Sequence, residues 1–548
     1  MSFDILLGRL IQNTTQVSLV LFLPELTLCA TIVVLLLVRL CNLDRIIRPV
    51  GVSLVGGLIA LGIAGKEFYD LADGVQSATP IFTGLLAYDQ FTVFFRLFLI
   101  TFVILVTALT ALSGIPDLED GPDFYTLLFG ATIGMLLMAS TNNLLILFLG
   151  IEMASVPSYA MVGFLKGRRK ASEASLKFVV YGAGAAGVLL YGVSLLSGLT
   201  GTADFTEMAL RISQVVGTKG MSDPTVRTML LGILMVLVGL AFKLSIVPFH
   251  FWCPDAFEGA AAEVAGYLSI ASKAAAFALL VRFCRMIVGD HVGALANLNY
   301  ALGIGLGLVA ALTATFGNLA AYSQKNVKRL LAYSTIAHAG YMLMAVAAMM
   351  VILNGPHVAN VEVSLNVSRA IEGLLYYLCV YMFMNLGAFA VVALVRNEIF
   401  SEEIDDYNGL AQQAPRYCLC MAVCLFSLIG LPPFGGFFAK WAIFSSLLQA
   451  GYVSRIMWVV LVIGGVNTVF SLFYYLRVLK AMYLTPRPEG ARRTEDALPA
   501  GAYVLIIALP VLLTGIGVTP VLRLVGTAAA AIFQWPHVAS VAQLPHGM

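Results

Sequence analysis

The stretch from Asn143 to Phe164, NLLILFLGIEMASVPSYAMVGF, is an apolar segment long enough to cross a lipid bilayer as a helix. It contains one carboxylate, Glu152, near its middle. About nine residues of helix place this side chain about 14 Å into the span, close to the bilayer centre. An ionisable group at that depth costs about 2.5–3.5 kcal/mol on insertion scales, so it normally has a partner and a function.

The whole chain has the composition of a membrane protein. Of its 548 residues, 60% are hydrophobic and only 11% are charged, too few to cover a soluble domain of this length. Apolar runs of roughly 18–28 residues recur along it, which predicts an all-α, polytopic membrane helix bundle of about 14 transmembrane helices rather than a barrel. We expect these spans near residues 17–38, 50–68, 88–112, 124–140, 143–164, 172–198, 228–247, 262–287, 298–322, 327–353, 369–395, 416–450, 456–484 and 500–518.

Other simple features exclude several classes of protein. The net charge of +2, with no basic run among aromatic residues, gives no sign of nucleic-acid binding. Met1–Gln16 has neither a basic start nor a small-residue cleavage site, so no cleavable signal peptide is expected. The eight cysteines lie mostly in apolar runs and are interpreted as packing residues. A metal or redox role for Cys418, Cys420 and Cys424 is the alternative.

The distribution of lysine and arginine predicts the orientation of the chain. Positive residues gather in alternate loops, whereas the loops around 70–88, 140 and 354–368 have almost none. Placing the positive loops inside puts both termini outside, on the periplasmic side of a bacterial inner membrane. The acidic loop Pro116–Asp123 is an exception to this trend. The positive residues of the inside loops are Arg39, Arg45, Arg48, Lys166, Arg168, Arg169, Lys170, Lys325, Lys328, Arg329, Lys480, Arg487, Arg492 and Arg493.

Two of the predicted spans are interrupted by proline and glycine. One reads KLSIVPFHFWCPDAF at 243–257, and the other reads LIGLPPFGGFFAKW at 428–441. Proline removes a backbone donor and glycine loosens a helix, so such segments are tolerated at membrane depth only against protein or a water-filled cavity. Paired broken helices therefore indicate an ion path of the kind found in transporters.

Weak matches between the two halves indicate a duplicated unit. Pro248-Phe249 resembles Pro433-Phe434, EASLKFVVYGAGA resembles EGLLYYLCVYMFM, and VPSYAMVGF faintly resembles HAGYMLMAV, in the same order. We expect two five-helix repeats, at 124–287 and 298–484, the second inverted because each unit has an odd number of spans. Residues 1–123 then form an N-terminal three-helix segment, and residues 498–548 form a C-terminal helix and tail.

The polar segment Thr202–Arg227 predicts a short surface helix, because its apolar residues fall on one helical face. These residues are Phe205, Met208, Ala209, Ile212, Val215 and Val216. The tail beyond Pro520 shows a similar but weaker pattern.

Three lysines in later spans are candidate partners of Glu152. Lys243 precedes the first break, Lys440 follows the second, and Lys273 lies too deep in SIASKAAAFALL to reach the headgroups easily. An ammonium removed from water releases its proton more readily, and two protonated lysines about 7 Å apart repel by about 2.4 kcal/mol at an effective dielectric of about 20. A change at Glu152 would therefore alter whether Lys243 holds its proton, and a row of such groups can pass the effect along. Ion pairs that merely order the bundle are the alternative.

Three further ionisable residues are weaker candidates. His338, in AYSTIAHAGYM, titrates in the range that proton transfer needs, or it is simply a hydrogen-bonded helix histidine. Lys177 lies near the inside end of its span, where a lysine also reaches the headgroups. Glu25, in FLPEL, favours a structural or interface role. The sequence has no recognisable haem pair, iron–sulfur ligand set, flavin motif or nucleotide-binding loop.

Taken together, these motifs resemble the antiporter-like membrane subunits of respiratory complex I, the NADH-quinone oxidoreductase of bacteria. The similarity runs from about Leu21 to Lys480 and is carried by FLGIEMASVPSYAMVGF, SEASLKFVVYGA, AFKLSIVPFHFWCPDAFEGA, SIASKAAAFALL and LIGLPPFGGFFAKW. The resemblance implies proton pumping in the membrane arm, driven by electron transfer from NADH to quinone in other subunits. It implies that the proton path includes Glu152, Lys177, Lys243, Lys273 and Lys440.

The same resemblance implies what surrounds the chain. FMN, iron–sulfur clusters and quinone would belong to partner subunits, with no cofactor in this chain and with neighbouring membrane-arm subunits and lipid around it. Two other functions fit the same residues: a cation/proton subunit of a multi-subunit sodium/proton antiporter, and a structural membrane scaffold whose buried charges are only ion pairs. The partners found in the native complex would separate the pump from the antiporter.

Overall fold

The computed structural model describes residues 3–44, 46–116, 120–288, 296–354, 361–489, 492 and 497–534, and most of these are helical. The α-helices are α1 (Phe3–Asn13), α2 (Leu23–Leu40), α3 (Pro49–Ala72), α4 (Gln90–Ser113), α5 (Gly121–Ser140), α6 (Leu144–Val162), α7 (Arg169–Thr200), α8 (Phe205–Lys219), α9 (Pro224–Leu244), α10 (Trp252–Gly259), α11 (Ala262–Tyr267), α12 (Lys273–Val288), α13 (Ala296–Ala321), α14 (Val327–Leu353), α15 (Val361–Ile399), α16 (Pro415–Ile429), α17 (Gly435–Val453), α18 (Arg455–Tyr483), α19 (Leu498–Ile516) and α20 (Val518–Gln534). Shorter elements are the π-helical turns η1 (Thr14–Ser18) and η2 (Leu268–Ser272), the 3-10 turns η3 (Ile404–Tyr407) and η4 (Leu410–Gln412), and a hairpin of β1 (Thr79–Ile81) and β2 (Leu86–Tyr88).

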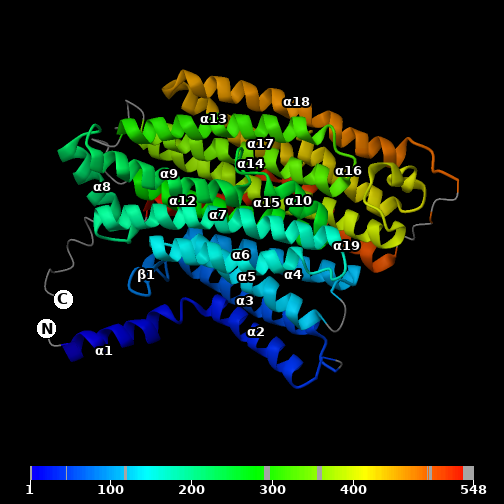
Figure 1. Ribbon diagram of the computed structural model, residues 1–548, viewed down its shortest axis with the longest axis horizontal. Coiled ribbons are helices and arrows are strands. Elements are labelled where there is room, and N and C mark those ends of the chain that lie inside the picture. The colour runs from blue at the N-terminus through cyan, green and yellow to red at the C-terminus, as the bar shows by residue number, and fades with distance from the viewer. Residues whose placement is uncertain are drawn as a thin grey trace.

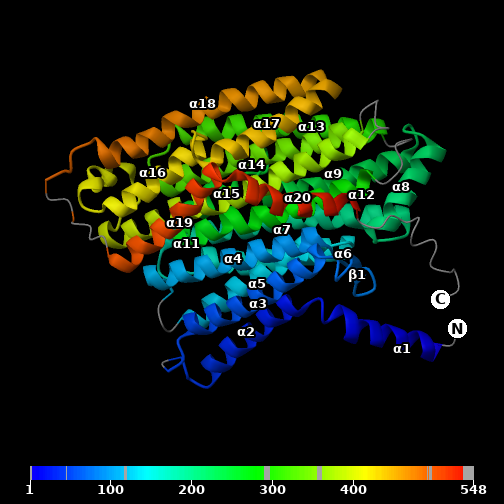
Figure 2. The same ribbon diagram turned by 180° about the vertical axis from the view of Figure 1, so that it is seen from behind.

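Most helices run side by side along the long axis of the molecule (Figures 1 and 2). Helices α2 and α3 form one edge, followed by α4, α5 and α6, while α13 and α18 form the opposite edge. At the centre lie α14 and α15, whose most apolar windows are 94% and 89% buried. Helix α1 begins, and α20 ends, toward the end of the bundle where α8 lies.

The predicted class of fold is confirmed. In the described part of the chain, 13 helices are long and apolar enough to cross a membrane. The span expected at 416–450, which was predicted to be broken, consists of two helices, α16 and α17. The short hairpin of β1 and β2, which the sequence analysis did not predict, covers the end of α5 through a bridge between Leu86 and Thr141.

Both predicted breaks are present. Helix α9 ends at Leu244 and α10 begins at Trp252; α16 ends at Ile429 and α17 begins at Gly435. Each first helix ends on a residue in the left-handed region, Ser245 with φ 57° and Gly430 with φ 90°. A left-handed residue terminates a helix by turning the chain away from its axis, and it is unstrained at Gly430 because glycine has no Cβ.

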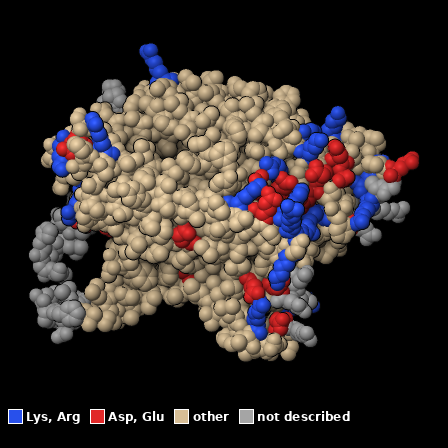
Figure 3. Space-filling view, in the orientation of Figure 1, with Lys and Arg blue, Asp and Glu red and all other residues tan. Residues whose placement is uncertain are grey.

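The loops predicted to face inside meet at one end of the bundle. Asp120 and Asp123, in the acidic loop that departed from the trend, form ion pairs with Lys166 and with Arg39. The acidic loop therefore supplies counter-charges to its positive neighbours, which accounts for the exception. Figure 3 shows charged side chains gathered mainly at this end, beside a broad surface with few charges.

A buried ion network joins the three helices of the N-terminal segment. Arg96 of α4 donates to Glu25 of α2 and to Glu67 of α3, each at 2.8 Å, and all three side chains are at most 8% exposed. A second buried pair, Arg282 with Asp89 at 2.8 Å, connects α12 to the beginning of α4. The ion pair with Arg96 gives Glu25 a contact between helices, as expected for a structural or interface role.

The surface helix predicted within Thr202–Arg227 is α8, with Phe205, Met208, Ile212 and Val216 buried. Asp204 caps it by accepting hydrogen bonds from the backbone of residues 206 and 207. The tail forms α20, which packs on α15 and α4. The predictions for Arg45, Arg493, residues 117–119, residues 355–360 and the tail beyond Gln534 lie outside the described residues.

Candidate functional site

Glu152 and Lys243 are brought together by α6 and α9. Lys243 is 7% exposed, and Glu152 is half-buried. The Lys243 ammonium donates to the Ser155 hydroxyl, which lies three residues after Glu152 on the same face of α6 and donates in turn to the Ile151 carbonyl. The two ionisable groups interact electrostatically but form no direct ion pair in the described structure. Ser155, which the sequence analysis missed, is therefore the direct partner of Lys243.

Aromatic rings surround the Lys243 ammonium. It lies 5.8 Å from the ring centroid of Tyr159 and 5.6 Å from that of Phe242. Trp252, which follows the first break, donates from its indole nitrogen to the Phe242 carbonyl at 2.9 Å and so ties α10 to α9. The faces of aromatic rings attract a cation without accepting its proton, so they can hold the charged form of this lysine in place.

Lys273 is the first residue of α12, directly after the π-helical turn η2. It is 1% exposed, and its ammonium donates to the Thr335 carbonyl of α14 at 2.7 Å. The Thr335 hydroxyl also lies 3.8 Å from the Cys253 sulfur of α10. Cys253 and Thr335 thus place weakly polar atoms between the first break and Lys273, and neither was predicted from the sequence.

His338 is the next buried polar group along α14. Its Nδ1 lies 2.5 Å from the hydroxyl of Tyr377, and its Nε2 lies 3.2 Å from the hydroxyl of Tyr475. Through space it interacts electrostatically with both Lys273 and Lys440. The histidine therefore combines the two alternatives from the sequence, being hydrogen-bonded within the bundle and also lying between two lysines of the row.

Lys440 lies beyond the second break, on α17. Its ammonium donates to the carbonyls of Leu428 and Ile429, at 3.0 and 2.8 Å, at the end of α16. The C-terminal end of a helix carries partial negative charge, so this contact stabilises a cation. The ammonium also lies 4.8 Å from the ring centroid of Tyr341. No carboxylate pairs with Lys440 in the described part of the chain, so its charge rests on helix and ring dipoles.

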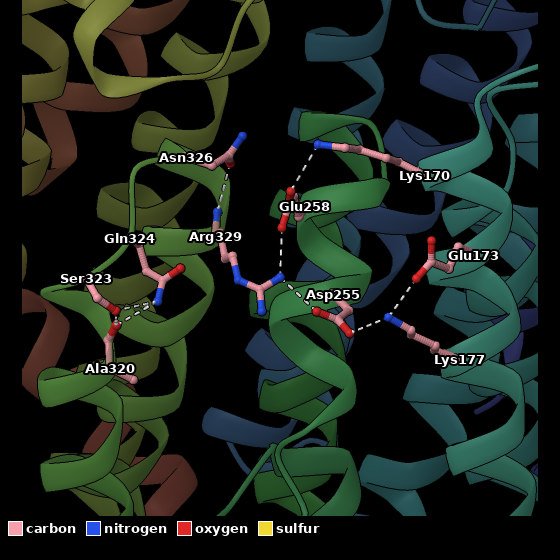
Figure 4. Close-up of polar contacts among 10 residues, drawn as sticks. All are labelled: Lys170, Glu173, Lys177, Asp255, Glu258, Ala320, Ser323, Gln324, Asn326 and Arg329. Atoms are coloured by element: carbon pink, nitrogen blue, oxygen red, sulfur yellow. Dashed lines mark hydrogen bonds and ion pairs between the residues drawn. The ribbon is translucent and has the colours of Figure 1, made fainter.

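Lys177 does not join this buried row. Its side chain is 41% exposed and forms ion pairs with Glu173 at 2.9 Å and with Asp255 at 3.0 Å. Figure 4 shows the larger cluster to which it belongs, carried by α7, α10 and α14. The cluster consists of Lys170, Glu173, Lys177, Asp255, Glu258 and Arg329, and it lines a cavity of about 190 Å³.

Arg329 holds this cluster together. It donates to Asp255 and to Glu258, each at 2.7 Å, while Lys170 pairs with Glu258 at 3.3 Å. Burial raises the pKa of Asp255, but hydrogen bonds from Lys177 and Arg329 outweigh it, so the pKa lies below its ordinary value. The pKa of Glu258 is lowered in the same way by Arg329 and Lys170. Both carboxylates, which the sequence analysis missed, are therefore ionised at neutral pH.

No group of three or more His, Cys, Asp or Glu side chains that could hold a metal ion is found among the described residues. The structure instead contains a row of ionisable side chains inside the bundle, with hydroxyls and carbonyls beside them. The row consists of the half-buried Glu152 and the buried Lys243, Lys273, His338 and Lys440.

Comparison with known proteins shows which family this chain belongs to. A family profile described as "NADH:quinone oxidoreductase/Mrp antiporter, TM" matches residues 141–471. NADH-quinone oxidoreductase subunit N of Anaeromyxobacter sp. (strain Fw109-5) is 37% identical over 518 residues, which cover 92% of this chain and 95% of that protein.

Two solved structures share the fold. A chain of respiratory complex I from Thermus thermophilus with bound aureothin is 28% identical, with a TM-score of 0.70 over 93% of this chain and all of that one. A chain of the Mrp complex from Dietzia sp. DQ12-45-1b has a TM-score of 0.76 over 94% of this chain and 97% of that one, at 20% identity, which is evidence of fold alone.

The fold and the buried lysine row thus define an antiporter-like membrane subunit. Within that class, the chain belongs to the family of NADH-quinone oxidoreductase subunit N. The sequence itself indicates this member: LPEL at Leu23–Leu26 and DQFTVFF at Asp89–Phe95 are similar to subunit N, and a lysine at 440 is expected for subunits N and L rather than M.

Proposed function

We propose that this chain is the proton-translocating subunit N of a NADH-quinone oxidoreductase, in which protons move along Glu152, Lys243, Lys273, His338 and Lys440. Electron transfer from NADH to quinone occurs in partner subunits, which carry FMN, iron–sulfur clusters and the quinone site. This chain contributes no redox chemistry of its own. It couples that reaction to proton movement through changes in the charge of its buried groups.

The observation that carries the proposal is that Lys243, Lys273 and Lys440 are buried without a carboxylate ion-pair partner among the described residues. Lys243 contacts Ser155, three residues after Glu152 on α6. Lys273 contacts Thr335 of α14. His338 lies one turn further along α14 and interacts with both Lys273 and Lys440. Buried lysines without a direct carboxylate partner are poor structural elements, since an unpaired buried charge destabilises a fold. Such groups are suited to binding and releasing protons.

Lys177 enters the proposal in a different role from the one implied by family resemblance. With Asp255 and Arg329 it connects α7, α10 and α14 at the charged end of the bundle. Since α10 follows the first break and α14 carries His338, movement in this cluster would shift the groups on both sides of Lys273.

We also propose the location and the internal division of the chain. The subunit lies in the inner membrane of a bacterium beside other membrane-arm subunits, with both termini periplasmic and the charged end cytoplasmic. Residues 124–287 and 298–484 are the two inverted repeats, flanked by 1–123 and 498–548. The similar left-handed ends of α9 and α16, at Ser245 and Gly430, support the duplication.

The test is substitution in the complex purified from a strain that carries the altered gene. Lys273→Ala, Lys243→Ala and Glu152→Gln are expected to leave assembly intact and to lower NADH-driven proton uptake into vesicles by about tenfold or more. Lys166→Ala is the matched control, because this side chain is 80% exposed at the charged end. Normal proton uptake in all three variants would falsify the proposed path and favour the scaffold.

The antiporter remains the second candidate, because the same fold occurs in the Mrp complex. Subunit analysis of the native complex separates the two functions. Flavin and iron–sulfur subunits that purify with this chain support the pump, whereas a complex of membrane subunits alone would overturn it.

A further inference from the structure

Glu263 is a buried carboxylate that the row described above does not include. It lies in α11, within the sequence AAAEVAGY, directly after the charged end of the bundle, and is 1% exposed. Neither of its carboxylate oxygens forms a hydrogen bond of normal geometry in the described structure, although the Ser113 hydroxyl at the end of α4 lies close enough to interact with it. A buried carboxylate without partners is costly, so a purely structural role does not account for it.

The positive groups nearest to Glu263 are engaged elsewhere. Lys328 of α14 donates to the Ala260 carbonyl at 2.6 Å and pairs with Glu402 at 2.8 Å. Arg396 of α15 also pairs with Glu402, at 3.6 Å. Both cations act on Glu263 only through space. Glu402 is therefore the direct ion-pair partner of both cations, and neither cation forms an ion pair with Glu263.

Polar positions lead from Glu263 toward Lys273. The two residues are connected by α11 and η2, ten residues or about 15 Å along one continuous helical segment. Between them lies Ser269, completely buried, whose hydroxyl accepts a hydrogen bond from Asn385 of α15 at 2.6 Å. The side-chain amide oxygen of Asn385, Oδ1, is also buried and has no hydrogen-bond partner. Such π-helical turns occur frequently at functional sites. Here η2 contains Ser269 and ends directly before Lys273.

We propose that Glu263 is a proton-carrying residue that loads Lys273 from the charged end of the bundle. This inference rests on the proposed function and extends it. The protonated Glu263 carboxyl releases its proton into the polar positions at Ser269 and Asn385, and the neutral amine of Lys273 takes up a proton, leaving a carboxylate and an ammonium. No electrons move, and the next proton reaches Glu263 from the charged end.

The test uses the assembled complex with Glu263→Gln, Glu263→Asp and the exposed control Glu403→Gln. Glutamine keeps the size of the side chain and removes its exchangeable acid proton. We expect Glu263→Gln to assemble normally, to lower coupled NADH:quinone turnover and proton uptake by about tenfold, and we expect Glu263→Asp to restore most of both. Glu403→Gln should match the unaltered complex.

A structural role gives the opposite result, because glutamine replaces an unpartnered buried charge by a neutral group of equal size. It predicts unchanged or higher thermal stability and unchanged turnover for Glu263→Gln, and that outcome overturns the inference. Lys273→Ala, measured in the same experiment, distinguishes a failure of the Glu263 proposal from a failure of the proposed proton path. If Lys273→Ala is impaired and Glu263→Gln is normal, only the role of Glu263 fails; if both are normal, the proposed path fails with it.

Discussion

The Lys243 ammonium donates a hydrogen bond to the Ser155 hydroxyl, and this serine lies on the same face of α6 as Glu152. Lys243 therefore bonds to a neutral hydroxyl, and it interacts with Glu152 through space rather than through an ion pair. A direct ion pair would hold the proton on the lysine, whereas a hydroxyl can accept from the ammonium and can donate to a neutral amine. Under the proposed function, this arrangement lets Lys243 exchange its proton while the charge of Glu152 changes the energy of the charged lysine.

Ser155→Ala should slow proton uptake without loss of assembly. A hydrogen bond to a charged group is worth about 1.5 kcal/mol, so the initial rate of NADH-driven uptake is expected to fall by about tenfold. Ser158→Ala is the matched control, because Ser158 is also buried on α6 and donates only to the Ala154 carbonyl. Equal rates in the two variants would contradict the role of Ser155.

Gly430→Ala should disturb Lys440. An added Cβ would lie 3.0 Å from Cδ of Lys440, and φ at this position is +90°. We expect a loss of about 1–2 kcal/mol in stability, with reduced proton uptake, because alanine is strained there and displaces the lysine stem. Gly465→Ala on α18 has open space around its Cβ and should leave thermal unfolding and uptake unchanged. Unaltered unfolding of Gly430→Ala would show that the break tolerates a side chain.

Arg96→Leu should prevent stable assembly. It leaves Glu25 and Glu67 buried without their shared partner, and removal of one member of a buried ion network costs about 3–5 kcal/mol. The amount of this subunit in purified complex, measured by quantitative mass spectrometry, is expected to drop sharply. Arg211→Gln is the control, because it breaks an exposed pair with Glu207 that contributes only about 0.5 kcal/mol. This substitution should not reduce the amount of the subunit in the complex.

The cluster around Arg329 should make stability depend on pH in the acid range. The pKa of Asp255 is lower in the folded protein than its unfolded value of about 3.9, so its ionised form stabilises the fold above that pH. As the pH falls through the unfolded and then the folded pKa, this contribution is lost. The midpoint of thermal unfolding should therefore differ most between the unaltered complex and Asp255→Asn near pH 7, and the two should converge in acid. A difference that is independent of pH would contradict the assignment.

Much of the architecture was accessible from one-dimensional patterns. Apolar runs of membrane length predicted the spans, proline and glycine predicted the breaks at 245–251 and 430–434, and the helical face of Phe205 and Met208 predicted α8. These features depend on residues close in sequence, through helix length and backbone preference, so the chain order alone determines them. The depths of Glu152 and Lys273 follow from the same lengths.

What only the tertiary structure decided is which side chains meet. Ser155 beside Lys243, Tyr377 and Tyr475 around His338, and the placement of Lys177 in an exposed cluster all join helices far apart in sequence. Glu263 was not predicted from the sequence, because no sequence pattern shows that a buried carboxylate lacks hydrogen bonds. The length of an apolar run determines how deep a residue lies along its own helix. The rotation and packing of neighbouring helices, set by the close fit of many side chains, determine what that residue contacts.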